Sequence, residues 1–134
     1  MQAGLRGSLY AAEDIQSARE MGFAVLPCDQ LRTLGPGGYA SLVATRVGSR
    51  PVFLSFDVDV LDPAFAPGTG TPEVGGLSTA EALAFLRALR GINLVGADVV
   101  EVSPPYDGPG QQTALAAANV AYELLSLRAL AQPR

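Results

Sequence analysis

Three aspartates follow one another closely at the end of an apolar stretch of the chain. The sequence VFLSFDVDVLDP, from Val52 to Pro63, begins with large apolar residues and then carries Asp57, Asp59 and Asp62 within six positions. Side chains alternate along an extended strand, so Asp57 and Asp59 are expected on the same side, about 6–7 Å apart along the chain. Two carboxylates held so close repel each other unless a cation or a proton lies between them. Their hard oxygen atoms suit Mg²⁺, Ca²⁺ or Mn²⁺. The alternative is that they cap loop amides or pair with arginines.

Two known aspartate motifs do not fit this stretch. A calcium-binding EF-hand loop requires a glycine after its third acidic position, and here Leu61 and Asp62 follow without one. A phosphatase of the haloacid dehalogenase type has threonine or valine where Leu61 stands, and it needs a lysine to hold phosphate. All nine basic residues of this chain are arginine, so that lysine is absent.

The pattern along the 134 residues is one of alternating strands and helices. Apolar runs predict strands at Ala3–Tyr10, Phe23–Asp29 and Ile92–Val102, in addition to the stretch that begins at Val52. Helical spacing predicts helices at Ala11–Met21, Tyr39–Val47, after Ser78 and at Thr113–Leu130, with the glycines of GPGG interrupting the chain near residue 36. Such alternation is typical of an α/β fold with a mainly parallel sheet flanked by helices.

The best local signal for a helix start is the sequence STAE. In this capping box, the Ser78 hydroxyl can accept a hydrogen bond from the Glu81 amide, and the Glu81 carboxylate can accept one from Ser78 in return.

Acidic side chains stand at the expected carboxyl ends of two strands. Asp57 and Asp59 end one of them and Glu101 ends another, and each is followed by a loop rich in glycine and proline. Ligands of open α/β sheets bind in the crevice beyond the carboxyl ends of the strands. We therefore expect a site formed by these three residues.

Composition excludes several classes of partner. A net charge of −4 argues against binding to nucleic acid, and no apolar run approaches the roughly 20 residues of a membrane span. The single cysteine, Cys28, cannot form an internal disulfide, which predicts a cytoplasmic protein. Because the chain has no histidine to act as a base beside a thiol, Cys28 is expected to pack in the core.

Two longer motifs resemble a known family. The segment SFDVDVLDPAFAPGTGTPEVGG (Ser55–Gly76) closely resembles the ureohydrolases, which include arginases and agmatinases, and GADVVEVSPPYD (Gly96–Asp107) resembles a second motif of the same enzymes. The LRGSLY segment and the closing helix are similar as well, so the resemblance covers essentially the whole chain. Details of the PGTGTPE and EVSP sequences look more like agmatinases and guanidino-acid hydrolases than like arginases.

The resemblance implies a hydrolase of linear amidines with two Mn²⁺ ions in its complete site. Asp57 and Asp59 would be metal ligands, Glu101 would be the catalytic residue that binds the substrate guanidinium, and Thr71 would bind substrate close to Glu101. The two ions would lower the pKa of a shared water, and agmatine or a guanidino acid would be hydrolysed to urea and an amine. The partners would be this small guanidino substrate and, in the complete enzyme, further copies of the same chain in a homo-oligomer.

The sequence departs from the family in one important way. Ureohydrolases complete the metal site with histidines and further aspartates from an N-terminal half, and this chain contains no histidine. Residues 1–134 therefore resemble a single partial domain, the C-terminal half of an arginase-like fold without the N-terminal metal-binding half. The chain alone is expected to be nearly inactive.

Other hypotheses stay open at this point. The chain would alternatively be a non-catalytic, truncated homologue that acts as a binding or regulatory subunit, or a metal hydrolase unrelated to ureohydrolases. Asp62, which precedes Pro63, is expected to begin a turn rather than to bind metal.

Overall fold

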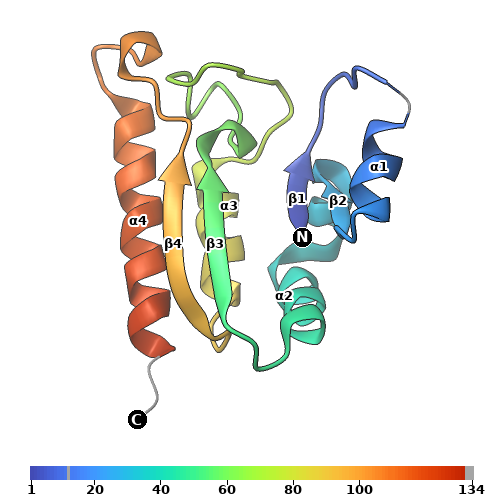
Figure 1. Cartoon of the computed structure of the whole chain (residues 1–134). Helices are drawn as coiled ribbons and strands as arrows, with labels where there is room; N and C mark the ends of the chain where they lie inside the picture. Colours follow the sequence, from blue (N-terminus) through green and yellow to red (C-terminus); the bar gives the residue numbers. More distant parts are fainter. Residues whose placement is uncertain (12, 132–134) are drawn as a thin grey trace.

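The computed structural model describes residues 1–11 and 13–131, in which strands and helices alternate (Figure 1). The strands are β1 (Gln2–Leu5), β2 (Val25–Pro27), β3 (Val52–Asp57) and β4 (Leu94–Val100). The α-helices are α1 (Asp14–Glu20), α2 (Cys28–Val47), α3 (Thr79–Ala88) and α4 (Gln112–Leu130). Short 3-10 helices, η1 (Val58–Val60) and η2 (Pro104–Tyr106), follow β3 and β4. The predicted α/β fold class is confirmed.

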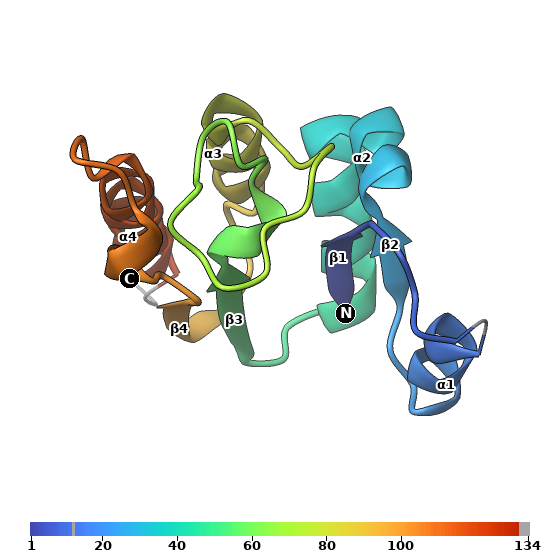
Figure 2. The ribbon, with the colours of Figure 1, turned by 90° about the horizontal axis from the view of Figure 1, so that it is seen from above.

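The strands form two parallel pairs. β1 pairs with β2, and β3 pairs with β4, each in parallel. Helices flank the strands as expected, but in this chain the two pairs are not hydrogen-bonded to each other, and β1 stands apart from β3 (Figures 1 and 2). The inner edge of each pair is therefore an unpaired strand edge.

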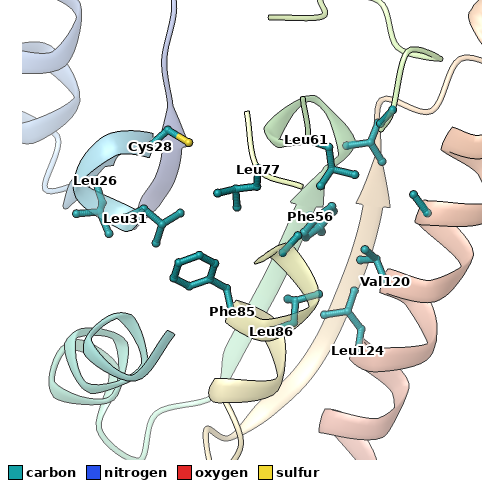
Figure 3. Close-up of a cluster of buried hydrophobic side chains, with 14 residues drawn as sticks. Leu26, Cys28, Leu31, Phe56, Leu61, Leu77, Phe85, Leu86, Val120 and Leu124 are labelled. Carbon is teal, nitrogen blue, oxygen red and sulfur yellow. The ribbon is translucent and has the colours of Figure 1, made fainter. Parts of the chain in front are cut away.

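Helices α2, α3 and α4 lie on the same side of the strands (Figure 2). A cluster of buried side chains fills the space between them, with Leu31 from α2, Phe56 from β3, Phe85 from α3 and Leu124 from α4 (Figure 3). The rings of Tyr39 and Phe85 meet edge to face, with their centroids 5.6 Å apart, and this contact joins α2 to α3. The cluster thus packs the two strand pairs against the same helices, although no backbone hydrogen bond joins the strands of one pair to those of the other.

The register of β3 against β4 follows from which side chains must be buried. Phe56 points into the core, and Leu54 packs against it. Phe53 and Ser55 face the opposite, open side, and Phe53 is 63% exposed. A slip of one residue would reverse these faces and expose Phe56. The register that results pairs Phe56 with Val99.

Local sequence signals explain where two of the helices start and bend. The capping box predicted at the start of α3 is present in full, with the Ser78 side chain bonded to the Glu81 amide and the Glu81 side chain bonded to the Ser78 amide. The interruption predicted at GPGG is a kink inside α2, where Gly35 has a φ of 64°. Glycine adopts this left-handed conformation readily because it has no Cβ.

Several predicted elements are shorter in the structure. The helix predicted at Ala11–Met21 is found as α1, and Ala12 lies outside the described residues. The strand predicted at Phe23–Asp29 is reduced to β2, because the chain turns into α2 at Cys28. β4 is likewise shorter at both ends than the predicted strand.

The prediction that Asp57 and Asp59 share one strand was wrong. β3 ends at Asp57, and residues Val58–Val60 form the 3-10 helix η1. The turn buries the Val58 side chain completely. Asp59 is therefore carried by a tight turn, and strand alternation does not set its direction.

The long loop between η1 and α3 is tied to the segment after β1 by Arg6. The Nη2 atom of Arg6 donates to the carbonyl oxygens of Asp59 and Glu73, each at 2.6 Å, and to that of Leu61 at 3.2 Å. Because a guanidinium presents several donors in a fixed fork, one side chain holds these backbone segments together. Arg6 thereby links the β1 side of the molecule to the β3 side.

Among the described residues, no helix has the length and apolar character needed to cross a membrane.

Gly76 provides a test of how tightly the loop is packed. A Cβ atom at Gly76 would lie 2.5 Å from the backbone nitrogen of Asp62, whereas a Cβ at Gly70, in the same loop, would have no neighbour within 4 Å. We predict that Gly76→Ala lowers the free energy of unfolding by about 1–3 kcal/mol, the usual cost of overpacking. Gly70→Ala, the matched control, should change it by less than about 1 kcal/mol. Urea denaturation measures both, and equal effects would contradict the close packing.

Candidate functional site

The parallel register brings the predicted acidic residues to one edge of the molecule. Asp57, the last residue of β3, pairs with Val100, the last residue of β4, so Glu101 follows immediately beside it. Both strands end at the upper edge in Figure 1, where the long loops begin. This is the edge at which the sequence predicted a site.

The pKa of Asp57 is shifted by burial and by neighbouring charges. Although part of its side chain reaches solvent, desolvation raises the pKa of Asp57 above its usual value, and the negative charges of Asp59 and Glu101 raise it further. A backbone hydrogen bond from the Asp59 amide acts in the opposite direction. Like charges gathered in this way favour a bound cation or proton. The structure thus brings Asp57, Asp59 and Glu101 within electrostatic reach of one another.

Asp57 also has a structural role. Its Oδ1 atom accepts a hydrogen bond of 2.8 Å from the Asp59 amide and so caps η1. This is the loop-capping alternative that the sequence left open. The other alternative, pairing with arginine, is not what the described residues show, since the ion pairs there join Arg32 to Glu81 and Arg87 to Glu123.

The carboxylate of Asp59 is held by two threonine hydroxyls. Thr69 donates to its Oδ1 atom and Thr71 to its Oδ2 atom. Thr69 is buried, with 2% of its surface exposed, so its hydroxyl is shielded from water. Hydrogen bonds to both oxygens fix the orientation of the carboxylate.

These contacts give the two threonines a partner that the sequence did not predict. The structure gives Thr71 a partner in Asp59, and its predicted proximity to Glu101 stays a prediction. Thr69 was not singled out from the sequence. The available signal was the repeat TGT, which places two hydroxyls two residues apart in the loop after the aspartates.

Glu101 occupies an unusual backbone conformation. Its φ is 66°, in the left-handed region, and its side chain is exposed. This conformation costs a residue other than glycine roughly 1–2 kcal/mol. Such strain is commonly found at functional sites, where the surrounding structure holds the residue in place.

Hydrogen bonds link the loops that follow β3 and β4. The Ser103 amide donates to the Gly68 carbonyl at 2.7 Å, and the Gly68 amide donates to the hydroxyl of Thr113 at 2.8 Å. Thr113 is completely buried. The carboxylate of Asp107 accepts from the amides of Thr113 and Ala114 and so caps α4. These supporting residues, unlike Asp57 and Glu101, were not identified from the sequence, because their partners are distant along the chain.

Asp62 has the turn-forming role expected of it. Its Oδ1 atom accepts from the Ala64 amide at 3.0 Å, and its Oδ2 atom accepts from the Gly75 amide at 2.8 Å. These backbone hydrogen bonds lower the pKa of Asp62. The carboxylate closes the loop rather than facing the other acids.

Cys28 packs as predicted. It is 3% exposed and belongs to the buried cluster shown in Figure 3.

The acidic residues have suitable chemistry for binding a metal ion, but they are too few to complete a metal site. Carboxylate oxygens are ligands that Mn²⁺ and Mg²⁺ accept readily. Within residues 1–11 and 13–131, however, no three His, Cys, Asp or Glu side chains are arranged to share an ion. Asp57 and Asp59 therefore fit as part of a metal site and do not complete one.

Comparison with known proteins identifies the family. A family model described as the arginase family matches residues 1–126. The chain belongs to the arginase family. Guanidinopropionase of Pseudomonas aeruginosa is 51% identical over 129 residues, which are 96% of this chain and 40% of that protein. Agmatinase of Proteus mirabilis is 54% identical over 108 residues, or 81% of this chain and 35% of that protein.

A solved structure confirms the fold at the level of the backbone. Proclavaminate amidinohydrolase from Streptomyces clavuligerus superimposes with a TM-score of 0.90 and 46% identity, and the match covers 98% of this chain and 43% of that one. The arginase-like fold predicted from the motifs is thereby confirmed. The chain spans about 40% of the length of the curated relatives it matches.

The backbone of Glu101 leads to a prediction about stability. At an ordinary strand position, alanine is more stabilising than glycine, by roughly 0.5–1 kcal/mol. At Glu101 the order should be reversed, because a Cβ atom is unfavourable at a φ of 66°. We expect the Glu101→Gly variant to be more stable than the Glu101→Ala variant, with a free energy of unfolding about 1 kcal/mol higher. Urea denaturation of the two variants tests this, and the ordinary order at Glu101 would rule out the strained conformation.

Proposed function

We propose that this chain forms part of a hydrolase that converts the guanidino group of a linear substrate to urea and an amine. The observation that carries the proposal is the meeting of Asp57, Asp59 and Glu101 at the carboxyl ends of β3 and β4, in a chain of the arginase family. The rest of the proposed active site belongs to the part of its relatives' length that this chain does not span.

Glu101 is suited to bind the guanidinium. Its exposed carboxylate lies beside Asp57 in a region of negative charge, which attracts a planar cation. Guanidinium and carboxylate form parallel, charge-assisted hydrogen bonds that fix the cation's orientation as well as its position. Two residues after Glu101, the Ser103 amide is hydrogen-bonded to the Gly68 carbonyl, and this bond would limit movement of the backbone that carries Glu101.

Asp57 and Asp59 are proposed as ligands of manganese. The two threonine hydroxyls orient the Asp59 carboxylate, and hydrogen-bond partners of this kind commonly fix the orientation of a metal ligand. When bound, manganese supplies the Lewis acidity that activates water for attack. Since these residues do not complete a site, the remaining ligands must come from outside the described residues.

The relatives suggest the class of substrate. Guanidinopropionase, agmatinase and proclavaminate amidinohydrolase are the names of similar proteins, and the first two denote action on linear guanidino compounds. A linear guanidino acid or agmatine is therefore the proposed substrate. Residues outside this chain would bind the charged tail of the substrate.

The test requires the rest of the enzyme. We would produce the 134-residue chain together with the portion of the Pseudomonas aeruginosa guanidinopropionase that it does not match, supply Mn²⁺, and measure urea released from guanidinopropionate and agmatine. Urea release by the complex is the expected result. A complex that forms, retains manganese and releases no urea would favour the alternative of a non-catalytic binding subunit.

Glu101→Gln should separate substrate binding from metal binding in this complex. The change keeps the shape of the side chain and removes its charge, so transition-state binding should fall by about 2–5 kcal/mol, the scale for a charged hydrogen-bonded pair that bound substrate shields from water in the complex. Manganese content should stay unchanged, whereas Asp57→Asn should lose metal and activity together. Asp98→Asn alters an exposed acid in the body of β4 and serves as the control. Wild-type urea release by Glu101→Gln would remove Glu101 from the site.

A further inference from the structure

The backbone of Gly68 is held where the loops after β3 and β4 meet the start of α4. Its amide donates to the hydroxyl of Thr113, in the first turn of α4, and its carbonyl oxygen accepts from the amide of Ser103, in the loop after β4. A Cβ atom at Gly68 would lie 2.6 Å from the Cβ atom of Asp107, so this backbone passes directly against the residue that caps α4. Both backbone polar groups of Gly68 are therefore bonded to other parts of the chain.

The residue after Gly68 holds one of the candidate functional carboxylates. Thr69 donates to the Oδ1 atom of Asp59, and both Gly68 and Thr69 are buried. Because Thr69 follows Gly68 directly, a shift of the Gly68 backbone would move the Thr69 hydroxyl. The orientation of the Asp59 carboxylate thus depends on where Gly68 is held.

The carbonyl side of Gly68 leads to Glu101. Ser103, whose amide Gly68 accepts, stands two residues after Glu101. The pairing of β3 with β4 ends at Asp57 and Val100, so it does not extend to Asp59 or Glu101. Beyond the strands, at the upper edge in Figure 1, Gly68 is a link between the loops that carry these two acids.

Thr113 connects this link to the core. Its residue is completely buried, and α4 packs its next inner residues, Ala116 and Val120, into the buried cluster. A buried amide that loses its acceptor is costly, so the Gly68 backbone would shift toward another partner if the Thr113 hydroxyl were removed. A purely local role would end there, with satisfaction of one amide. The bonds of Gly68 to Ser103 and of Thr69 to Asp59 carry such a shift to both acids.

We propose that Thr113 is a positioning residue, which sets the place of Glu101 relative to Asp59 through the backbone of Gly68. Its effect on catalysis rests on the proposed function, in which Glu101 binds the guanidinium and Asp59 binds manganese. The coupling between the two loops does not rest on it, because that coupling is a property of the hydrogen bonds of the chain itself.

Hydrogen exchange at single amides tests the coupling in the 134-residue chain. Thr113→Val keeps the branched shape of the side chain and removes the hydroxyl, whereas Thr113→Ser keeps the hydroxyl. In Thr113→Val, the amides of Gly68 and Ser103 should both exchange at least about tenfold faster relative to amides in the middle of α3. The acceptor of Ser103 is untouched by the substitution, so its faster exchange would report coupling. Thr113→Ser should keep both rates within about threefold of those in the unmodified chain.

Thr33→Val is the matched control. The hydroxyl of Thr33 donates to the carbonyl oxygen of Asp29 within α2, so the same substitution there removes a side-chain hydrogen bond of a different helix. Exchange at Gly68 and Ser103 should stay unchanged. If Thr113→Val does not fold, the unmodified chain decides the point: the two amides should lose protection with the same urea dependence, since they open together.

Kinetics test the catalytic part in the complex with the unmatched portion of the Pseudomonas aeruginosa guanidinopropionase. Thr113→Val should lower kcat for urea release at least about tenfold and change KM by less than about threefold, because a small misplacement of substrate against the catalytic groups is costly. Manganese content should equal that of the unmodified complex, since Asp57 and Asp59 are both kept. Thr113→Ser should restore kcat. A merely destabilising effect would instead lower kcat and manganese content together.

Two results would overturn the proposal. One is unchanged exchange at Ser103 in Thr113→Val, or separate opening of Ser103 and Gly68 in the unmodified chain, which would confine the effect of Thr113 to Gly68. The other is an active complex in which Thr113→Val leaves kcat unchanged or lowers it only in proportion to manganese content. If the unmodified complex releases no urea, the proposed function fails, and exchange at Ser103 then decides the coupling by itself.

Discussion

The pairing of β3 with β4 determines where chemistry is possible in this molecule. Burial of Phe56 and packing of Leu54 fix the register, and that register ends β3 at Asp57 opposite the last residue of β4. Glu101 then follows at once in a left-handed conformation. The position of the acidic cluster is thus a consequence of core packing, because a shift by one residue would both expose the core and separate the acids.

The sequence predicted the features that depend on neighbouring residues. The capping box at Ser78 depends on a residue three positions away, and the turn at Asp62 depends largely on an amide two positions away. The site's location was also predictable, since strands alternating with helices imply carboxyl ends at one edge. The motifs carried the family assignment, which a match over residues 1–126 confirms.

Features that depend on tertiary contacts were missed. The alternating aspartates predicted one continuous strand. The chain instead turns to bury Val58, so Asp59 lies on a 3-10 helix. The bond between Thr69 and Asp59 and the support of Gly68 by Thr113 connect residues 10 and 45 positions apart, and no local pattern encodes them. The division of the strands into two pairs is likewise set by tertiary structure, and local propensity carries no information about it.

A groove lined by β1 and β3 reaches the acidic site, since Asp57 is among its lining residues. Asp57 lies at the end of β3, whose inner edge is also a wall of the groove. The acids at this end of β3 do not complete a metal site within the described residues, so metal binding is expected to depend on arrival of the remaining ligands, as it does in proteins whose metal sites form only on folding.

Manganese content is the most direct measure of this coupling. Equilibrium dialysis followed by elemental analysis would compare the 134-residue chain alone with its complex with the unmatched portion of the guanidinopropionase. We expect the chain alone to retain no tightly bound manganese and the complex to retain two ions. Tight binding by the chain alone would show that its own side chains complete the site, and a stable complex without manganese would show that Asp57 and Asp59 are not metal ligands.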